Sequence, residues 1–578
     1  MQEDKNEVIL GIDLGTTNSE VAVVRDGKVH VLKVEGSFLI PSVVSLDEQG
    51  RILIGQPAVN KELLAPTNTI RWIKRSMGRQ ETVSLGDETW TPAMVSSLIL
   101  KRLKQAAEKF VGHPVDKAVI TVPAFFTERQ REATREAAEL AGLYSARLLN
   151  EPTAAALAYS LGQQGNDLCL VYDLGGGTFD VSIVDLSSDI MEVKASHGDT
   201  DLGGIDFDQM IFDEAREQFM QEHEIDLAKD PLARMRLMRA AEAAKIRLST
   251  EATADITEEF IVSKNGIPVH LKYTLTRTHF EEMIRPYVER ALGSVRAALE
   301  TSNTKPEQLN RVILVGGSTR IPLVSELLQK ELKMAPQAWL DPSTVVVMGA
   351  AIEAASLSGE TIGPLMVDIT PFSLGTICLG NDFELLNYIL IHRNTPIPCS
   401  ASKVFYKTHP GQDKIDIKVY QGESSQIEQS QLLDEFSLEG LSQEEQMDIH
   451  IKFELDRSGL LHVTVTDIYS GKKVNHTVTR SGKKATKQAN LADLDAIRIH
   501  KETEPVESEE YISVDHTKEI TDPITLDDKQ LLIQAQKLID KGKLDPIDQD
   551  ELERELQEMQ GGNRKTVNRL RGLLYLLD

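Results

Sequence analysis

The chain has 578 residues, a net charge of −26 and a pI near 5.0, with hydrophobic and charged contents that are ordinary for a globular protein. This acidity disfavours broad binding to nucleic acid or anionic membranes, no apolar run is long enough to span a bilayer, and the polar N-terminus lacks a signal-peptide pattern. Its length predicts roughly two to four domains. Because its three cysteines are far apart and show no metal spacing, we expect a reducing, cytoplasmic location. From the charge and the lack of a spanning run we expect no nucleic-acid or membrane partner.

The first distinctive element is a strand, a tight turn and a second strand near the N-terminus. Asp13 ends an apolar run, and Gly15, Thr16, Thr17 and Asn18 follow it. A glycine at such a turn lets the backbone approach a bulky anion and leaves N–H groups open to it.

Residues 8 to about 360 alternate strand-like runs with amphipathic helices, which predicts an α/β region whose helices cover sheets. The strands expected from apolar runs are residues 29–34 and 118–122, and the helices expected from periodicity are residues 92–110, 127–140 and 231–248.

The first turn pattern recurs at residues 172–184, where Asp173, three glycines and Asp180 separate two apolar runs. Position by position, Asp13 matches Asp173 and Glu20 matches Asp180. One hairpin present twice predicts two related lobes, and two anion-cradling turns facing each other would clamp a polyphosphate. The flanking carboxylates would be able to hold a hydrated cation. Taken alone, the glycine turn is as compatible with an ordinary hairpin as with a phosphate site.

A third glycine turn, at residues 315–320, follows an apolar run and precedes a helical pattern. This strand-to-helix position suits close approach to a nucleotide. The sequence contains no P-loop, Rossmann, zinc-protease, serine-hydrolase or paired-cysteine motif, and its 13 histidines are scattered.

The pattern changes after residue 360. Residues 363–368 form a short apolar segment beside a Gly-Pro break, and a buried interdomain linker and the first strand of the next domain are equally compatible with it. Residues 390–480 then alternate with period two, as in 415–420, 449–455 and 461–466, which predicts a half-buried antiparallel sheet or sandwich.

The C-terminal part loses and then regains periodicity. Residues 481–524 predict a flexible connector. Thr525 with Asp528 fits a capping box for one helix, Asp545-Pro546 opens a second, and a third follows Gly561-Gly562.

Several of these segments jointly resemble the signatures of DnaK-type heat-shock chaperones. They are Gly11–Ser19, Val171–Asp180 and Ile313–Arg320, with Thr121–Ala124, Asn150–Ala156, Asn394–Pro398 and Val419–Glu423. The resemblance covers roughly residues 8–480, and it is specific because the motifs occur together. The short C-terminus makes the chain most similar to the short-lid, HscC-like bacterial branch.

The resemblance implies an actin-like two-lobed ATPase domain, an antiparallel β-sandwich and a short α-helical lid. The implied limits are 1–362 for the nucleotide-binding domain, 363–372 for an interdomain linker, 373–482 for a peptide-binding sandwich, 483–524 for the flexible connector and 525–578 for the lid.

The resemblance also implies an activity and its partners. We expect an ATP-dependent chaperone of the stress response that hydrolyses ATP to ADP and phosphate with Mg²⁺, with K⁺ as a further candidate ion. Such a protein binds exposed apolar stretches of unfolded polypeptides with an affinity gated by ATP. Its implied partners are client polypeptides, a J-domain cochaperone and a nucleotide exchange factor.

Site residues carry over position by position. By resemblance, Asp13 and Asp173 would hold the Mg²⁺ shell through water, and Lys74, Glu151 and Thr178 would flank the γ-phosphate and the attacking water. The residues implied to bind nucleotide are Gly15, Thr16, Thr17, Asn18, Gly175, Gly176, Gly177, Gly204, Glu242, Lys245, Ser249, Gly316, Gly317, Ser318 and Arg320. The residues implied to couple the domains are Pro123, Arg131, Arg147, Asn150 and Asp368, and those implied to line the peptide cleft are Phe405, Ile415 and Ile417.

Each assignment has a structural alternative. Lys74 would alternatively be a solvated turn residue, and Glu151 only a helix-start carboxylate. Glu242, Lys245 and Ser249 share one helical face by their spacing and would alternatively form an exposed charged surface. The three cleft residues are equally compatible with ordinary sandwich core.

The chain departs from the family pattern at a few positions. Ile205 replaces a usual Glu, Ser343 a usual Asp near the adenine, and Thr408 lies where a residue helps to arch over the peptide. Pro364 precedes the linker, and the loop 379–388 is longer than usual. These departures bear on client retention and cochaperone choice.

Two other classes of protein remain as alternatives. One is a small-molecule kinase on the same two-lobed fold, which does not need a sandwich after residue 390. The other is a scaffold that binds ATP without hydrolysing it, against which the joint presence of Lys74, Glu151 and Thr178 argues.

Overall fold

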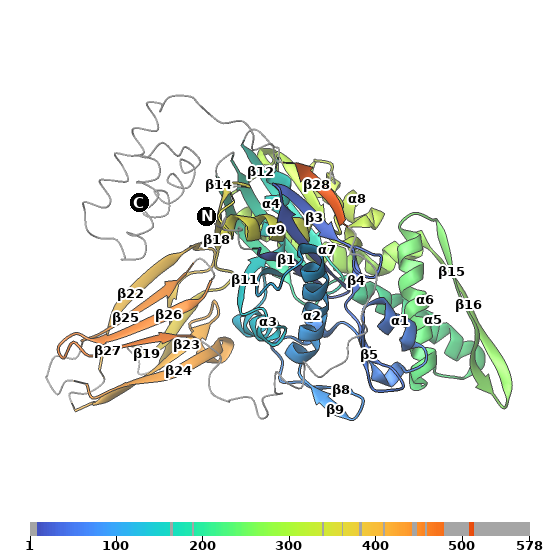
Figure 1. The fold of residues 1–578 in the computed structure, drawn as a ribbon, viewed down its shortest axis with the longest axis horizontal. Helices are drawn as coiled ribbons and strands as arrows, with labels where there is room; N and C mark the ends of the chain where they lie inside the picture. The colour runs from blue at the N-terminus through green and yellow to red at the C-terminus, as the bar shows by residue number, and fades with distance from the viewer. Residues whose placement is uncertain are drawn as a thin grey trace.

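In the computed structural model, two α/β lobes are followed by a β-sandwich (Figure 1). The structure describes residues 8–161, 166–187, 190–337, 340–360, 362–380, 384–407, 411–441, 448–456, 459–478 and 508–513. The predicted lid and most of the predicted connector lie outside the described residues, and so does Thr408 of the predicted sandwich.

Lobe I is built on a seven-stranded sheet in the order β11-β10-β1-β2-β3-β28, with β4 paired to β2. Its strands are β1 (Leu10–Leu14), β2 (Asn18–Arg25), β3 (Lys28–Leu32), β4 (Ile40–Pro41), β10 (Lys117–Val122), β11 (Ser145–Asn150) and β28 (Ser508–Ser513). Helix α2 (Pro92–Val111), capped by Thr91, packs on β1 and β2, and α3 (Glu128–Leu140), capped by Thr127, packs on α2 and β11. Both helices confirm the predicted spans.

Smaller elements surround this sheet. They are β5 (Val44–Leu46), β6 (Ile52–Ile54), α1 (Gln56–Glu62), η1 (Pro66–Asn68), β7 (Thr69–Ile70), η2 (Ile73–Ser76), β8 (Val83–Leu85) and β9 (Glu88–Trp90). From the 3-10 segment η2, Arg75 contacts Gly177 and Asp206 of lobe II.

Lobe II is built on a six-stranded sheet in the order β17-β12-β13-β14-β18-β21. Its strands are β12 (Asp167–Leu174), β13 (Phe179–Leu186), β14 (Ile190–Asp199), β17 (Arg311–Val315), β18 (Leu365–Ile369) and β21 (Pro396–Ile397). Helix α7 (Arg277–Thr301) packs on β13 and β14. The other elements of the lobe are α5 (Gly204–His223), η3 (Leu227–Lys229), α6 (Pro231–Leu248), β15 (Thr253–Lys264), β16 (Ile267–Thr276), η4 (Pro306–Gln308), η5 (Gly317–Arg320) and α8 (Pro322–Leu332).

Two apolar helices, α4 (Glu151–Ser160) and α9 (Val345–Leu357), cross each other between the sheets. Both are buried nearly all round, as expected for helices without a polar face. Their backbones approach so closely that a Cβ on Gly349 would lie 1.7 Å from the carbonyl oxygen of Ala154. Only glycine fits at that position, which fixes how the lobes are joined.

The segment at residues 363–368 contributes to a strand of the lobe II sheet, not to the first strand of a sandwich sheet. Its strand β18 pairs in parallel with β14 of lobe II and antiparallel with β21, which comes from the part of the chain that forms the sandwich. The chain between the domains is therefore a strand of lobe II that is buried from Val367 to Ile369.

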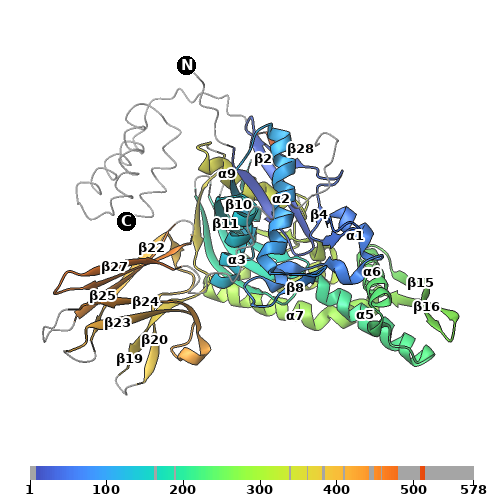
Figure 2. The same ribbon diagram turned by 60° about the horizontal axis from the view of Figure 1, so that its bottom comes forward.

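The sandwich consists of two four-stranded sheets, in the orders β20-β19-β23-β24 and β22-β25-β26-β27. Its elements are β19 (Leu374–Leu379), β20 (Leu385–Ile391), β22 (Cys399–Tyr406), β23 (Lys414–Gln421), η6 (Ile427–Gln429), β24 (Gln431–Glu439), β25 (Asp448–Leu455), β26 (Leu461–Asp467) and β27 (Lys473–Thr477). The period-two segments are confirmed as β23, β25 and β26, whose inward residues form one core. Figure 2 shows the sandwich beside α3 of lobe I.

Part of the predicted connector is a strand. β28 pairs antiparallel with β3, placing Ser508 opposite Leu32 and Glu510 opposite His30 (Figure 1). The chain thus returns from the sandwich to the edge of the lobe I sheet. No helix in the described part of the chain is long and apolar enough to cross a membrane.

Candidate functional site

The glycine turns that follow β1, β12 and β17 come together between the lobes. A Cβ on Gly176 would lie 2.1 Å from Thr17 Oγ1, and one on Gly177 would lie 2.6 Å from Thr16 Cγ2. A Cβ on Gly316, whose φ is +83°, would lie 2.4 Å from a lobe II backbone oxygen at the end of β12. The two hairpins therefore face each other at contact distance, and the third turn closes on one of them.

Carboxylates flank the turns of the two hairpins, on the strand before the turn and on the strand after it. Asp13 accepts a hydrogen bond from Thr121 Oγ1 at 2.6 Å, and Asp180 accepts one from the Phe125 amide at 3.1 Å. Burial raises the pKa of Asp13, raises that of Asp173 further, and raises that of Asp180 to about 8, because a charged carboxylate is poorly solvated there. Neighbouring carboxylates add to the rise at Asp173 and Asp180.

These oxygen ligands fit Mg²⁺. Among the described residues, no three acidic, His or Cys side chains are grouped closely enough to form a complete metal cage. Mg²⁺ is commonly held by one or two carboxylates together with water and phosphate oxygens, so such a cage is not needed. Asp13 and Asp173 would hold it, and the cation would neutralise developing phosphate charge.

Lys74 and Glu151 form a buried ion pair next to these carboxylates. Lys74 Nζ lies 2.6 Å from Glu151 Oε1, and 4% of Lys74 is exposed. Lys74 is therefore not a solvated turn residue. Glu151 begins α4, but its carboxylate is engaged by the lysine. Burial raises the pKa of Glu151, and the charge of Lys74 opposes the rise.

The residues predicted to hold the adenosine are partly brought together. Lys245 Nζ contacts Asp208 at 2.7 Å and the Gly204 carbonyl at 3.0 Å, and a Cβ on Gly204 would lie 2.5 Å from Ser318 Oγ. Lys245 therefore points into the site rather than forming an exposed surface. Arg320 lies further out, where it pairs with Asp341 at 2.7 Å.

Glu242 and Ser249 flank Lys245 on α6. Glu242 Oε2 lies 3.5 Å from Arg71 Nη1 of lobe I. Ser249 caps the end of α6, and its hydroxyl donates to the Lys245 carbonyl at 3.5 Å. The spacing of these residues predicts that they share one face of α6. At Glu242 and Lys245 this face is directed toward the region between the lobes.

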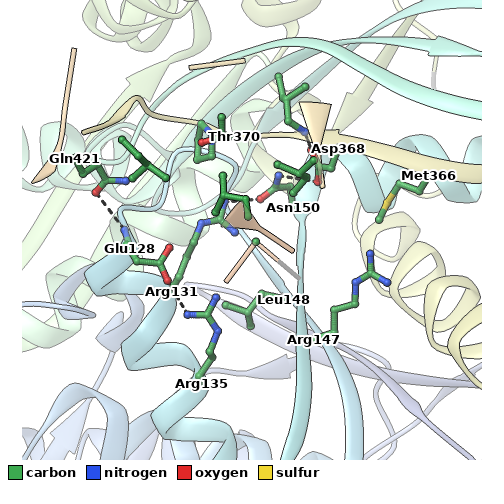
Figure 3. A pocket seen from close by; sticks show the side chains of 16 residues that line it. Glu128, Arg131, Arg135, Arg147, Leu148, Asn150, Met366, Asp368, Thr370 and Gln421 are labelled. Atoms are coloured by element: carbon green, nitrogen blue, oxygen red, sulfur yellow. Dashed lines mark hydrogen bonds and ion pairs between the residues drawn. The ribbon is translucent and has the colours of Figure 1, made fainter. Parts of the chain in front are cut away.

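Hydrogen bonds join Arg131, Asn150 and Asp368 of β18 next to the ion pair. Arg131 Nη2 donates to Asn150 Oδ1 at 2.6 Å, and Asn150 Nδ2 donates to Asp368 Oδ2 at 2.9 Å (Figure 3). Arg131 also donates to the Phe126 carbonyl at 3.2 Å, in the turn that follows Pro123. Since Asn150 directly precedes Glu151, the nucleotide site and β18 are joined through neighbouring residues.

A pocket opens beside this chain of bonds, between lobe I, β18 and the sandwich. Arg131, Arg147, Asn150 and Asp368 all line it, and Gln421 of the sandwich lies at its rim (Figure 3). Arg147 pairs with Glu353 of α9 at 2.6 Å. Burial raises the pKa of Asp368, and the Ile369 amide and Arg131 oppose the rise.

The sandwich contacts both lobes around this pocket. Gln421 Oε1 accepts from the Glu128 amide at 3.3 Å, and Arg129 donates to the Leu432 carbonyl at 3.0 Å. Arg393 donates to the Ser196 carbonyl of lobe II at 2.7 Å and lies 4.9 Å from the ring centroid of Phe125. These contacts hold the sandwich against both lobes, close to the hydrogen bonds that join Arg131, Asn150 and Asp368.

The predicted cleft residues differ in burial. Ile417 is 2% exposed and lies in the sandwich core, and Phe405 and Ile415 are partly buried against that core. Tyr388 packs edge-on to Phe405 with ring centroids 5.5 Å apart. Exposed apolar side chains nearby on the same strands are Leu385, Tyr388, Val404 and Tyr406.

The sequence did not single out several residues that complete the site. Thr121 fixes Asp13, Asp208 receives Lys245, and Arg75 reaches across to Asp206. A signal for the last was available, because Arg71, Arg75 and Arg79 recur every four residues around η2, where acidic residues of lobe II face them.

The fold and site define a two-lobed domain whose glycine turns meet between the lobes and whose strand β18 joins it to a β-sandwich. A family model described as Hsp70 protein matches residues 9–570. The Chaperone protein DnaK of Thermotoga neapolitana is 41% identical over 516 residues, which cover 88% of this chain and 86% of that protein. The corresponding proteins of Thermotoga petrophila and Thermotoga maritima are 42% identical over the same length.

The chain therefore belongs to the Hsp70 family, and it is an ATP-dependent molecular chaperone with ATPase activity. This excludes the small-molecule kinase and the non-hydrolysing scaffold. Membership of the short-lid, HscC-like branch stays a prediction, because the lid lies outside the described residues.

Proposed function

We propose that the facing hairpins hold MgATP and that Lys74 and Glu151 position the water that attacks its γ-phosphate. Thr16, Thr17 and the glycines at 175–177 bind the phosphates, and Asp13 and Asp173 hold the Mg²⁺ shell through water. The observation that carries this proposal is the contact between the two turns, where a Cβ on Gly176 would meet Thr17 at 2.1 Å.

The chemistry required of the protein is modest. Phosphoryl transfer needs positioning and charge neutralisation more than covalent help. Lys74 supplies a buried positive charge, Glu151 orients it, and Thr178 lies beside the attacking water. The adenosine is held by Glu242, Lys245 and Ser249 of α6, with Gly204, Gly317 and Arg320, and K⁺ is a further ion that the remaining carboxylates would accept.

We further propose that the nucleotide state reaches the sandwich through Pro123, Arg131, Asn150 and Asp368. The supporting observation is the continuous hydrogen-bonded path from the residue that precedes Glu151 to β18. ATP then weakens the hold on a client and hydrolysis tightens it, a coupling between two distant sites. A J-domain cochaperone would act where Arg147, Asn150 and Asp368 line one pocket, and an exchange factor would act on lobe II.

Clients are proposed to be extended, apolar segments of unfolded polypeptides. Such a segment suits a cleft that offers apolar contacts and main-chain hydrogen bonds. Phe405 and Ile415, with the exposed apolar residues around them, support this assignment, whereas Ile417 acts from the core beneath. Three free cysteines, none of them paired, support a reducing cytoplasmic location.

The coupling is tested by the ATPase rate with and without an unfolded apolar peptide. We expect the peptide to stimulate the wild type several-fold and Asp368→Asn to lose that stimulation while keeping basal turnover, because the amide removes the charge that faces Arg131. Asp416→Asn, at an exposed position on β23, is the matched control and should behave as the wild type. A fully stimulated Asp368→Asn variant would contradict the proposed path.

A further inference from the structure

The carbonyl groups of the lobe II glycine turn accept hydrogen bonds from neighbouring residues. The Gly175 carbonyl accepts from the Gly204 amide at 3.0 Å and from Ser318 Oγ at 2.9 Å. The Gly176 carbonyl accepts from the Ile205 amide at 2.8 Å. These donors all belong to lobe II, so the lobe itself fixes the first two peptide groups of the turn.

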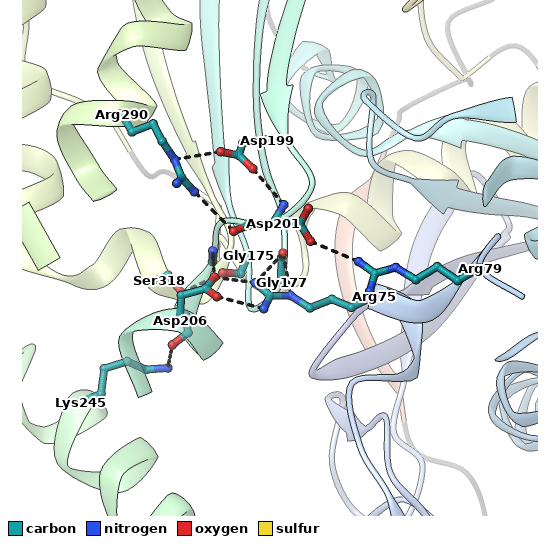
Figure 4. A network of polar contacts seen from close by, with 12 residues as sticks. Arg75, Arg79, Gly175, Gly177, Asp199, Asp201, Asp206, Lys245, Arg290 and Ser318 are labelled. Atoms are coloured by element: carbon teal, nitrogen blue, oxygen red, sulfur yellow. Dashed lines mark hydrogen bonds and ion pairs between the residues drawn. The ribbon is translucent and has the colours of Figure 1, made fainter. Parts of the chain in front are cut away.

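The carbonyl of Gly177 is held by lobe I instead. Arg75, in η2, donates to it from Nε at 3.0 Å and from Nη2 at 2.9 Å (Figure 4). The same guanidinium forms a two-point ion pair with Asp206, at 3.0 Å from Nη1 to Oδ1 and 2.5 Å from Nη2 to Oδ2. Asp206 in turn accepts from the Gly203 amide at 2.8 Å. One side chain of lobe I thus contacts both the turn and the beginning of α5.

The direction of each carbonyl sets the direction of the next amide. In a trans peptide the C=O and N–H point in opposite directions. Donors behind Gly175, Gly176 and Gly177 therefore aim the following amides, the last of which is that of Thr178, toward the opposite side of the turn. Thr178 is also the residue assigned a place beside the attacking water, so the bond from Arg75 bears directly on its orientation.

We infer that Arg75 is a positioning residue that completes the phosphate-binding turn from across the gap between the lobes. Because its donors come from lobe I, the third peptide group of the turn is fixed only while the lobes are closed. Lobe closure and correct geometry at Thr178 then occur together, which makes hydrolysis depend on closure. This inference rests on the proposed role of the turn in binding phosphate.

Arg79 shows what a simple contact between the lobes looks like. It pairs with Asp201 of lobe II at 3.5 Å, and the two side chains are 51% and 69% exposed. The side chains of Arg75 and Asp206 are 21% and 23% exposed, and Arg75 adds charge-assisted bonds to a backbone carbonyl. Exposed ion pairs contribute little, whereas bidentate, partly buried ones fix geometry. Arg79 is therefore a matched control of the same residue type.

The test measures kcat, MgATP affinity and amide hydrogen exchange at residues 175–178 for the wild type, Arg75→Ala, Arg75→Lys and Arg79→Ala. We expect Arg75→Ala to lower kcat by about 100-fold, as a small misplacement of a catalytic group does, with MgATP affinity changed much less. Arg75→Lys keeps the charge facing Asp206 but lacks the planar guanidinium that bonds to two groups at once, so its loss of kcat should be intermediate. Arg79→Ala should match the wild type.

The exchange measurement does not depend on activity. In the nucleotide-free protein, Arg75→Ala should speed exchange at the turn, and Arg79→Ala should not. The inference would be overturned if Arg75→Ala kept the wild-type kcat and the wild-type exchange rate at the turn. It would also be overturned if Arg75→Ala and Arg79→Ala lost kcat and MgATP affinity to the same extent. If the wild type hydrolyses no ATP, the proposed function fails, and the exchange result alone decides the role of Arg75.

Discussion

The β1–β2 and β12–β13 hairpins share a sequence pattern and a strand register, yet they supply different chemistry. Asp13 lies opposite Glu20 in one, and Asp173 lies opposite Asp180 in the other. The lobe I turn offers the side chains of Thr16 and Thr17, whereas the lobe II turn consists of three glycines and offers backbone amides.

The second carboxylate of each hairpin also differs. Asp180 accepts the Phe125 amide, whereas neither carboxylate oxygen of Glu20 has a hydrogen-bond partner within the described residues. Burial raises the pKa of both groups. The two hairpins thus share a backbone frame and differ in what surrounds it, since Lys74 and Arg75 of η2 approach from lobe I and the lobe II turn presents backbone groups.

Removing the positive charge of Lys74 from lobe I should have the largest effect on turnover. Lys74→Ala should retain ATP binding, because the phosphate cradle remains, but should lose about 100- to 1,000-fold in turnover, the usual cost of one charge-stabilising donor. Calorimetry and steady-state turnover measure the two quantities. Lys264→Ala, at an exposed position on β15, is the control and should change neither. Unchanged turnover in Lys74→Ala would remove its assigned role.

The contact between the turns can be broken from the lobe II side. A Cβ on Gly176 would lie 2.1 Å from Thr17 Oγ1, whereas the nearest atom to a Cβ on Gly175 is a carbonyl oxygen 3.7 Å away. Gly176→Ala should therefore push the turns apart and weaken nucleotide affinity by about tenfold, in line with the usual cost of overpacking. Gly175→Ala should have little effect. Equal affinities for the two variants would show that the turns do not need to touch.

The smallest expected effect concerns the pH dependence of stability. The folded pKa of Asp180, about 8, lies above its unfolded value, so between the two the folded state holds a proton that the unfolded chain releases. This contribution is complete below about pH 4 and is lost as the pH rises toward 8. Urea unfolding without nucleotide or Mg²⁺ should show a fall in unfolding free energy from pH 5 to pH 8.

The variant Asp180→Asn isolates that contribution. It should flatten the fall by about 1–3 kcal/mol, since one unit of pKa difference corresponds to roughly 1.4 kcal/mol. Asp185→Asn, a more exposed position on the same strand, is the control and should keep the wild-type slope. A wild-type slope in Asp180→Asn would mean that other carboxylates carry the pH dependence.

Local patterns were enough to predict most of the fold. The twin hairpins, the helix at 231–248 and the sandwich strands follow from periodicity and turn residues, which act over short distances along the chain. Neither alternative for residues 363–368 could be chosen from sequence, because β18 owes its place to pairing with β14, far away in the chain. The same holds for β28, whose partner is β3.

The site could be predicted where residues belong to a motif and not where they meet only in space. Lys74 and Glu151 follow from the family resemblance, and their contact at 2.6 Å agrees with it. Arg75 and Asp206 are 131 positions apart, and the regular spacing of Arg71, Arg75 and Arg79 does not identify the partner of each arginine. Ile417 was predicted to line the cleft and lies in the sandwich core, because an alternating pattern does not distinguish cleft residues from core residues.

The central claim is that two facing hairpins hold one Mg-nucleotide, and calorimetric titration of ATP with and without Mg²⁺ tests it most directly. The account predicts uptake of one ATP per chain that is strongly weakened when Mg²⁺ is removed. Absence of Mg-dependent uptake by the folded wild-type protein would contradict it.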